Sequence, residues 1–223
     1  MDKKIDIPMA VIKRMPKYFR YLEDLLRGNV SIISSRELSV KIGFTPSQIR
    51  QDLNSFGEFG SRGYGYNIQE LYEQVKGILG LYNEHKAVII GAGNIGQAMA
   101  NYSRLEKPRV RLEAIFDANP KLIGISINDV EIRDVDTLDS YLSENQIDIC
   151  IICVPGSQVE GVKDIMVKNN VKGIWNFSPA DINIPEGIIT ENVHLSDSLL
   201  TLTCLLNEHQ SQQGQKDSED RIA

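Results

Sequence analysis

The chain has 223 residues, 42% hydrophobic and 24% charged, which is the composition of a folded globular protein and excludes wholesale disorder. It has no apolar run near the ~18 residues of a membrane span and no secretion signal at its start, so a cytoplasmic protein with no membrane partner is expected. The net charge of −6 hides a basic first third, because residues 1–66 carry 11 Lys and Arg against 7 Asp and Glu, and this asymmetry favours an anionic partner there.

Short helices are predicted along the first third of the chain. Pro16 is suited to the first turn of a helix that ends near Gly28. Ser34 and Glu37 have the spacing of a capping box, and Thr45 is suited to cap a third helix. The predicted elements are helices over about 16–28, 34–43 and 45–56, a glycine-rich turn between short strands over 57–66, and a helix over about 68–82.

The third helix has an apolar face and a polar face. Ile49, Leu53 and Phe56 share the apolar side at helical spacing. The polar side carries residues that hydrogen-bond to base edges or phosphates, namely Ser47, Arg50, Gln51 and Asn54. A helix, a short turn and a polar-faced helix are typical of a helix-turn-helix, and the turn Ser61-Arg62-Gly63 is placed like a wing that sets Arg62 on the DNA backbone or minor groove. The alternative is an ordinary solvated helix beside a hairpin.

The remainder of the chain predicts strands that alternate with helices. Ile147–Val154 is a nearly continuous apolar run, which is typical of a parallel strand buried on both faces. Ser157 and Glu160 have the spacing of another capping box. The alternation predicts an α/β fold with a doubly wound parallel sheet. Strands are predicted over 87–90, 110–116, 147–154 and 173–177, and helices over about 94–104 and from 157 onward.

A glycine turn follows the first of these strands. Its sequence is Gly91-Ala92-Gly93-Asn94-Ile95-Gly96, a GxGxxG that opens a predicted helix. In this context the glycines allow a tight turn, a close approach to a pyrophosphate and close packing of helix on strand. Asp117 ends the next strand 21 residues after Gly96, where a carboxylate binds the ribose 2′-OH of NAD and repels the 2′-phosphate of NADP. The alternative is a glycine-rich packing turn with Asp117 as a strand-end cap.

With these motifs in place, the sequence resembles the Rex family of redox-sensing transcriptional repressors over about residues 8–206. The stretch Arg62-Gly-Tyr-Gly-Tyr66 ahead of a GxGxxG in one short chain is specific to that resemblance. Further matching segments are Arg14-Met-Pro16, Ser35-Arg-Glu-Leu38, Gln48–Leu53, Cys153-Val-Pro155 and Gly173–Ala180.

The resemblance implies a repressor and not an enzyme. A winged helix would bind palindromic operator DNA as a homodimer, a Rossmann domain would bind NADH and NAD⁺ competitively, and NADH would release the DNA. A helix over about 196–207 would swap onto the partner subunit, unless it packs on its own sheet. The implied DNA-binding residues are Thr45, Ser47, Gln48, Arg50, Gln51, Asn54, Ser61, Arg62, Gly63 and Tyr66. The implied cofactor-binding residues are Gly91, Ala92, Gly93, Asn94, Ile95, Gly96, Tyr102, Asp117, Val154, Pro155, Phe177, Ser178 and Pro179.

Two positions differ from the family pattern. The family commonly has Lys after the arginine matched by Arg50, and this chain has Gln51, which would alter its operator preference. The family usually has an aspartate after the segment matched by Asn192-Val193, where it bonds to the tyrosine matched by Tyr102 across the dimer. This chain has His194 there, and His194 or Asp197 is the candidate for that role. A histidine would make the nucleotide response depend on pH.

The cysteines and histidines predict no chemistry of their own. Cys150 and Cys153 match CxxC, but residues i and i+3 of a strand point to opposite faces, so packing is favoured over redox chemistry. Three cysteines cannot close a disulfide framework, and the histidines lack metal-ligand spacing, so no metal partner is expected.

Two other functions stay open on the residues alone, a small NAD-dependent dehydrogenase and a structural subunit that binds CoA or a nucleotide. Little chain remains after the nucleotide-binding part to build a substrate pocket, which disfavours the dehydrogenase. The predicted domains are a winged-helix DNA-binding domain over 1–82, a Rossmann NAD(H)-binding domain over 83–194, a dimerisation helix over 195–207 and a disordered tail over 208–223.

Overall fold

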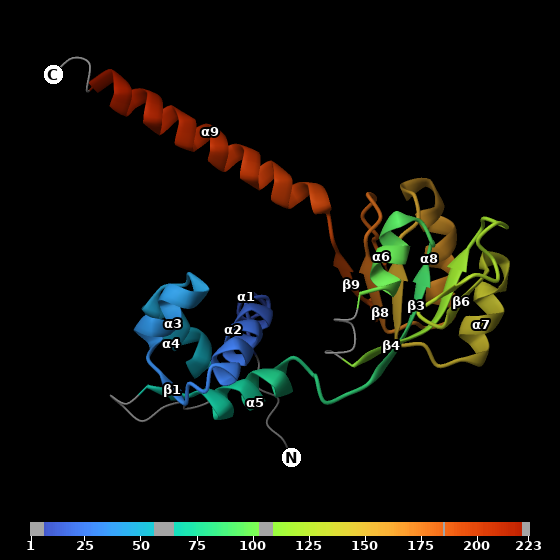
Figure 1. The fold of residues 1–223 in the computed structure, drawn as a ribbon. Helices are drawn as coiled ribbons and strands as arrows, with labels where there is room; N and C mark the ends of the chain where they lie inside the picture. The colour runs from blue at the N-terminus through green and yellow to red at the C-terminus, as the bar shows by residue number, and fades with distance from the viewer. Residues whose placement is uncertain (1–6, 56–64, 103–108, 185, 220–223) are drawn as a thin grey trace. The chain divides into compact units, whose positions relative to one another are not determined.

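The computed structural model describes residues 7–55, 65–102, 109–184 and 186–219. The chain divides into two compact units, one made of Met1–Glu84 with Lys107–Arg109 and the other made of the rest. Figure 1 shows helices gathered in the first unit and a sheet between helices in the second. The first unit ends two residues beyond the boundary that the sequence predicted at residue 82.

The first unit combines short helices with a two-stranded ribbon. The strands β1 and β2 pair antiparallel, with Ile33 opposite Tyr66. In the sequence, β1 precedes α3 and β2 follows α4, so the ribbon joins the two segments that flank these helices. The elements are α1 (Met9–Ile12), α2 (Met15–Arg27), β1 (Ile32–Ile33), α3 (Ser35–Ile42), α4 (Pro46–Asn54), β2 (Tyr66–Asn67) and α5 (Ile68–Ile78).

The start and stop signals of α3 and α4 are those that the sequence predicted. Ser34 Oγ accepts a hydrogen bond from the Glu37 N–H at 3.2 Å, and the Glu37 carboxylate accepts one from the Ser34 N–H at 2.8 Å. This is the predicted capping box. Gly43 ends α3 in the left-handed conformation, with φ of 78°, and Thr45 caps α4 through the Gln48 N–H. The turn between α3 and α4 is therefore specified locally.

A buried carboxylate fixes α4 to the start of α2. Asp52 is 1% exposed and accepts hydrogen bonds from Arg14 Nε at 2.7 Å, from Arg14 Nη2 at 2.6 Å and from the Tyr18 hydroxyl at 3.0 Å. Burial and the adjacent Asp52 carboxylate raise the pKa of Tyr18, so its hydroxyl remains a donor. Because Arg14 and Tyr18 both donate hydrogen bonds to Asp52, these bonds fix the orientation of α4 against α2.

The second unit is built on a seven-stranded sheet in the order β5-β6-β4-β3-β7-β8-β9. The pairs from β6 to β9 are parallel, and β5 pairs antiparallel with β6. From β6 onward this is the strand order 3-2-1-4-5-6 of a Rossmann fold, which confirms the predicted fold class. The strands are β3 (His85–Ile90), β4 (Val110–Asp117), β5 (Ser126–Ile127), β6 (Val130–Asp134), β7 (Ile149–Ile152), β8 (Gly173–Asn176) and β9 (Ile189–Asn192).

Helices cover both faces of this sheet, with an apolar core on each. One core joins Val88 and Phe116 to α7 (Leu138–Glu144) and α8 (Val159–Lys168), which follow the short 3-10 turns η2 (Val135–Thr137) and η3 (Gly156–Gln158). The other core joins strand residues of the opposite parity to α6 (Asn94–Ala100). Both faces are apolar because both are covered, as a parallel sheet requires.

Two local predictions are wrong. Ser157 and Glu160 form no capping box, since α8 begins at Val159 after the 3-10 turn and has no side-chain cap. Glu160 instead pairs with Lys163. The tail from 208 was expected to be disordered, but α9 (Leu195–Glu219) runs well past the predicted end at 207. The tail is polar yet contains four Gln and two Glu, residues with good helix propensity.

Candidate functional site

The glycine turn joins β3 to α6 at the carboxyl end of the sheet. A Cβ on Gly96 would lie 1.8 Å from the carbonyl oxygen of Gly91, so no other residue fits there. Gly91 has φ of 98°, and a Cβ on it would lie 2.7 Å from the Cys153 carbonyl oxygen. A Cβ on Gly93 would meet nothing within 4 Å. Gly91 and Gly96 are therefore required by the close packing of the backbone, whereas Gly93 leaves open space above the turn.

Asp117 holds this turn from the end of β4. Its Oδ2 accepts a hydrogen bond from the Ala92 N–H at 2.6 Å, and its Oδ1 accepts one from the Asn119 N–H at 2.7 Å. Asp117 also lines the cavity above the turn. A carboxylate oxygen accepts more than one hydrogen bond, so the same side chain can cap the turn and accept a bond from a ribose hydroxyl. The two alternatives drawn from the sequence are thus compatible.

A cavity of about 710 Å³ lies over the carboxyl ends of β4, β3, β7 and β8. This is the position where the strand order reverses, at which Rossmann folds bind ligands. Asp117 lies on one side of the glycine turn, and Val154 and Phe177 lie on the other. A dinucleotide with its adenosine ribose at Asp117 and its phosphates over Gly93 would therefore extend toward an apolar wall.

Most of the predicted cofactor residues meet at this cavity. Those that line it are Gly91, Gly93, Asn94, Ile95, Asp117, Val154, Pro155, Phe177 and Pro179. Ala92, Gly96 and Ser178 are buried and do not line it. Tyr102 is 43% exposed and does not line the cavity. The sequence analysis missed further lining residues, namely Ile90, Phe116, Ala118, Asn119, Val135, Cys153, Gln158 and Val162.

The polar face of α4 is exposed and its apolar face is buried. Ile49 and Leu53 have no exposed surface, which confirms these two residues of the predicted inner face, and Phe56, the third, lies outside the described residues. The predicted base-reading and phosphate-binding side chains Ser47, Arg50, Gln51 and Asn54 are all exposed, and Gln48 is half-buried. Such a face presents one guanidinium, two amides and one hydroxyl to a partner, a set suited to a major groove.

The predicted wing is only partly described. Ser61, Arg62 and Gly63 lie outside the described residues, which resume at Gly65. Tyr66 belongs to β2 and is 9% exposed, so the structure places its ring mainly in the core. Burial raises the pKa of Tyr66, and the nearby Arg50 charge opposes that shift. Tyr66 therefore faces mainly inward.

Arg50 is held in place before any partner binds, since its Nη1 donates a hydrogen bond to Ser35 Oγ at 3.0 Å. If the guanidinium reads a guanine edge, as the sequence predicts, Arg50→Ala should weaken binding of a cognate duplex by roughly 1–3 kcal/mol. Fluorescence anisotropy at one fixed salt concentration measures this. Lys121→Ala removes an equal charge from an exposed position of the second unit and should leave the DNA affinity unchanged. Equal losses of affinity in the two variants would show that Arg50 contributes only through its charge and does not read a base.

The two cysteines of the CxxC lie on opposite faces of the sheet. Cys150 belongs to the core under α7 and α8, and Cys153 packs against the core under α6. Burial raises the pKa of each thiol to about 12. Neither thiol is therefore a thiolate at neutral pH, and packing explains the motif, as predicted.

His194 contacts an acidic residue of its own chain. Its Nε2 lies 2.9 Å from Asp181 Oδ1, in the loop after β8. Asp197 lies in the first turn of α9, and its N–H donates to the His194 carbonyl oxygen. Neither residue bonds to Tyr102 among the contacts of this single chain that the structure describes.

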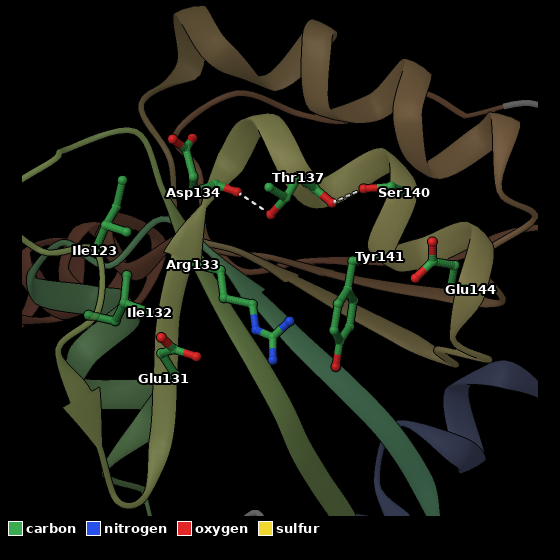
Figure 2. A pocket seen from close by; sticks show the side chains of 9 residues that line it. All are labelled: Ile123, Glu131, Ile132, Arg133, Asp134, Thr137, Ser140, Tyr141 and Glu144. Atoms are coloured by element: carbon green, nitrogen blue, oxygen red, sulfur yellow. Dashed lines mark hydrogen bonds between the residues drawn. The ribbon is translucent and has the colours of Figure 1, made fainter.

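A second cavity, of about 390 Å³, lies beside β6 and α7 and is drawn in Figure 2. There the Arg133 guanidinium lies 5.0 Å from the centre of the Tyr141 ring. None of the predicted site residues lines it. Among the described residues, no group of His, Cys, Asp and Glu side chains is arranged to hold a metal ion. Over the same residues, no helix has the length and apolarity needed to cross a membrane.

Comparisons with known proteins match both units. Residues 6–54 match the family model described as a putative DNA-binding protein N-terminus, and residues 82–180 match the model described as a CoA binding domain. The redox-sensing transcriptional repressor Rex of Clostridium tetani is 62% identical over 210 residues, which cover 94% of this chain and 100% of that protein.

Solved structures agree with these matches over nearly the whole chain. The crystal structure of RSP, a Rex-family repressor, is 51% identical with a TM-score of 0.86 and covers 94% of this chain and 98% of that one. RSP in complex with β-NAD⁺ and operator DNA is 52% identical, also with a TM-score of 0.86, and covers 94% of this chain and 97% of that one.

Proposed function

Because this chain belongs to the Rex family of redox-sensing transcriptional repressors, we propose that its α4 face binds operator DNA and that NADH in the cavity of the second unit releases it. The protein is a transcriptional regulator and not an enzyme, so the dehydrogenase interpretation falls. A cytoplasmic location accords with a role at the chromosome. RSP is known with β-NADH as well as with β-NAD⁺ and operator DNA, and the same ligands are assigned here.

The observation that carries this proposal is the cavity over the glycine turn. Gly93 leaves room for phosphates, and Asp117 stands where it would accept from an adenosine ribose and repel a 2′-phosphate. At the other end Val154, Pro155 and Phe177 form an apolar wall. An unpaired cation is costly to bury against such a wall, so neutral reduced nicotinamide binds more tightly there than the oxidised ring.

Release of DNA requires two arrangements of the dimer. Palindromic half-sites about one helical turn apart, ~34 Å, are reached by the two α4 helices in one arrangement only. NADH shifts the equilibrium between the two dimer arrangements only if it binds one of them more tightly than the other. Equal affinity for both arrangements would leave the equilibrium unchanged. NADH must therefore favour the arrangement whose α4 helices do not match the half-site spacing.

The homodimer of this proposal forms through α9. In the single chain its large apolar side chains are more than half exposed, so they are not buried on their own sheet, the alternative left open by the sequence. Leu199, Leu202 and Leu206 lie along one side of the helix at spacings of three and four residues. A partner subunit that accepts this helix, and returns its own, would cover them.

We expect Leu202→Asp to yield monomers in light scattering, because a carboxylate would be buried between the subunits. Binding of a palindromic duplex should fall by about 100-fold, since the two half-sites are then bound separately. Thr201→Asp, on the polar side of the same helix, is the matched control and should remain a dimer. A dimeric Leu202→Asp variant would contradict the assignment of α9 to the interface.

The function is tested by a gel shift on DNA upstream of the protein's own gene, with NADH, NAD⁺ or CoA added. NADH should dissociate the complex at concentrations at which NAD⁺ and CoA leave it intact. Calorimetry on the free protein should show tighter binding of NADH than of NAD⁺. A complex that survives saturating NADH, or equal affinities for the two nucleotides, would contradict the proposal.

A further inference from the structure

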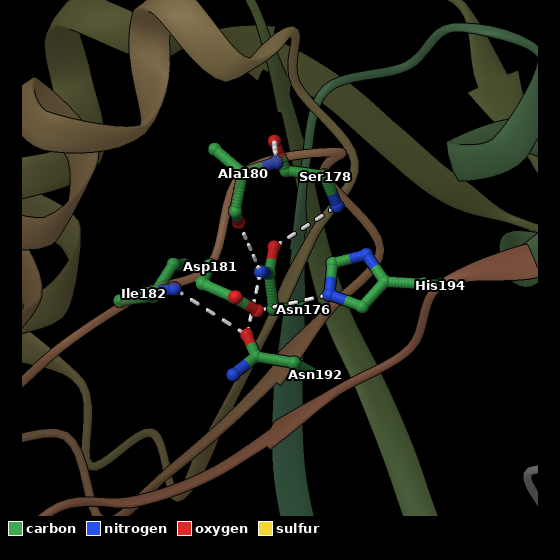
Figure 3. A network of polar contacts seen from close by, with 7 residues as sticks. All are labelled: Asn176, Ser178, Ala180, Asp181, Ile182, Asn192 and His194. Atoms are coloured by element: carbon green, nitrogen blue, oxygen red, sulfur yellow. Dashed lines mark hydrogen bonds and ion pairs between the residues drawn. The ribbon is translucent and has the colours of Figure 1, made fainter. Parts of the chain in front are cut away.

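The loop that follows β8 contacts two different parts of the second unit. Phe177 and Pro179 line the cavity over the glycine turn. The next residues of the same loop contact instead the end of β9, at Asn192, and the segment before α9, at His194, as Figure 3 shows. One short loop thus contacts both the nucleotide-binding cavity and the base of the dimerisation helix.

Asn176 sets the shape of this loop from the buried end of β8. It has no exposed surface, and its Oδ1 accepts a hydrogen bond from the Ser178 N–H at 2.9 Å. Its Nδ2 donates to the Ala180 carbonyl oxygen at 2.8 Å and to Asn192 Oδ1 at 2.8 Å. The buried amide therefore bonds to both sides of the loop and to the last residue of β9.

Asn192 continues the connection toward α9. Its Oδ1 accepts from Asn176 and also from the Ile182 N–H at 3.4 Å. Two residues on, His194 Nε2 lies 2.9 Å from Asp181 Oδ1. The residues just before Leu195, where α9 begins, are thus joined to the loop by two side-chain contacts from two consecutive loop residues.

These contacts restrict how the loop and the helix base can move. A displacement of Phe177 or Pro179 by a ligand carries the Asn176 amide bonds with it or breaks them. Because Asn192 accepts from both ends of the loop, it shifts with the loop, and α9 begins three residues later. Such a shift at the base of a helix is the kind of small movement that dimer interfaces amplify.

We propose that Asn192 is a positioning residue that transmits occupancy of the nucleotide cavity to α9. The inference rests on the function proposed above and specifies which contact links its two ligands. In thermodynamic terms, Asn192 contributes to the coupling between NADH and DNA while contributing little to the affinity for either ligand alone.

The test measures that coupling as the ratio of DNA dissociation constants with and without saturating NADH, on the full-length dimer. Asn192→Ala should reduce this ratio by at least about fivefold. The NADH affinity without DNA, and the DNA affinity without NADH, should each stay within about twofold of the wild type. Asn192→Asp keeps the accepting oxygen at the same place and should restore the coupling.

Two results would overturn the inference: an unchanged ratio in Asn192→Ala, or equal impairment in the Asp variant. A wild type that NADH does not release from DNA would instead refute the proposed function itself, so the two failures are distinguishable. Hydrogen exchange on the wild type is a second test that needs no variant. NADH should change deuterium uptake over residues 189–199, and unchanged uptake there would also overturn the inference.

Discussion

Replacement of Gly93 by valine is expected to abolish NADH binding and leave a correctly folded protein that still binds DNA. A Cβ at this position meets no atom of the described residues within 4 Å, and the backbone has φ of −70°, which valine tolerates. The added side chain would therefore fill the open space above the turn, where the phosphates approach the backbone. Calorimetry should show at least about a 100-fold loss of NADH affinity, or about 2.7 kcal/mol.

Gly96→Ala is the matched comparison within the same turn. Its Cβ would lie 1.8 Å from the Gly91 carbonyl oxygen, so α6 must move off β3. This variant should lose NADH binding and also unfold at a lower temperature, whereas Gly93→Val should unfold at the wild-type temperature. A Gly93→Val protein that is still released from DNA by NADH would show that the phosphates lie elsewhere.

Replacement of Asp52 by alanine is expected to destabilise the first unit by roughly 3 kcal/mol. Removal of the carboxylate leaves the Arg14 guanidinium partly buried without its bidentate acceptor, and the Tyr18 hydroxyl buried without a partner. Hydrogen bonding to Asp52 is also what chiefly raises the pKa of Arg14. Urea unfolding followed by circular dichroism measures the loss, and DNA binding should fall with it.

Asp52→Asn separates charge from shape in this cluster. The amide keeps one accepting oxygen but offers a donor toward a guanidinium, so an intermediate loss of stability is expected. If Asp52→Ala were as stable as the wild type, the buried contact would not be what fixes α4. Cys204→Ser, at an exposed position of α9, controls for the effect of a substitution as such on the unfolding curve.

Much of the fold could be predicted because its signals are local. The capping box at Ser34 and the cap at Thr45 are each specified within a few residues and are confirmed, and the left-handed Gly43 that ends α3 is equally local. The elements over 126–144 were not predicted, because β5 and β6 are short and polar and depend on pairing at the sheet edge. The start of α8 was misplaced because Ser157, the predicted cap, lies within the 3-10 turn that follows Pro155.

The site was predicted where a motif fixes the geometry. The glycine turn and Asp117 follow from spacing, whereas Cys153, Val135 and Gln158 reach the cavity only because the sheet order brings distant strand ends together. The rule that ligands bind beyond the carboxyl ends at a strand-order reversal would have found the residues after β7. The buried contact of Asp52 could not be predicted, since its partner Arg14 lies 38 residues away in the sequence.

The position of Asp117 has a consequence for any attempt to re-engineer this protein for a phosphorylated cofactor. The oxygen that would repel a 2′-phosphate is on the same carboxylate that accepts the Ala92 N–H. Replacing Asp117 by a residue without an accepting oxygen, such as alanine, would leave the Ala92 N–H without this bond and loosen the glycine turn. A redesigned pocket would therefore need a neutral acceptor such as asparagine here, with the new cation introduced from the exposed neighbour Ala118 or Asn119.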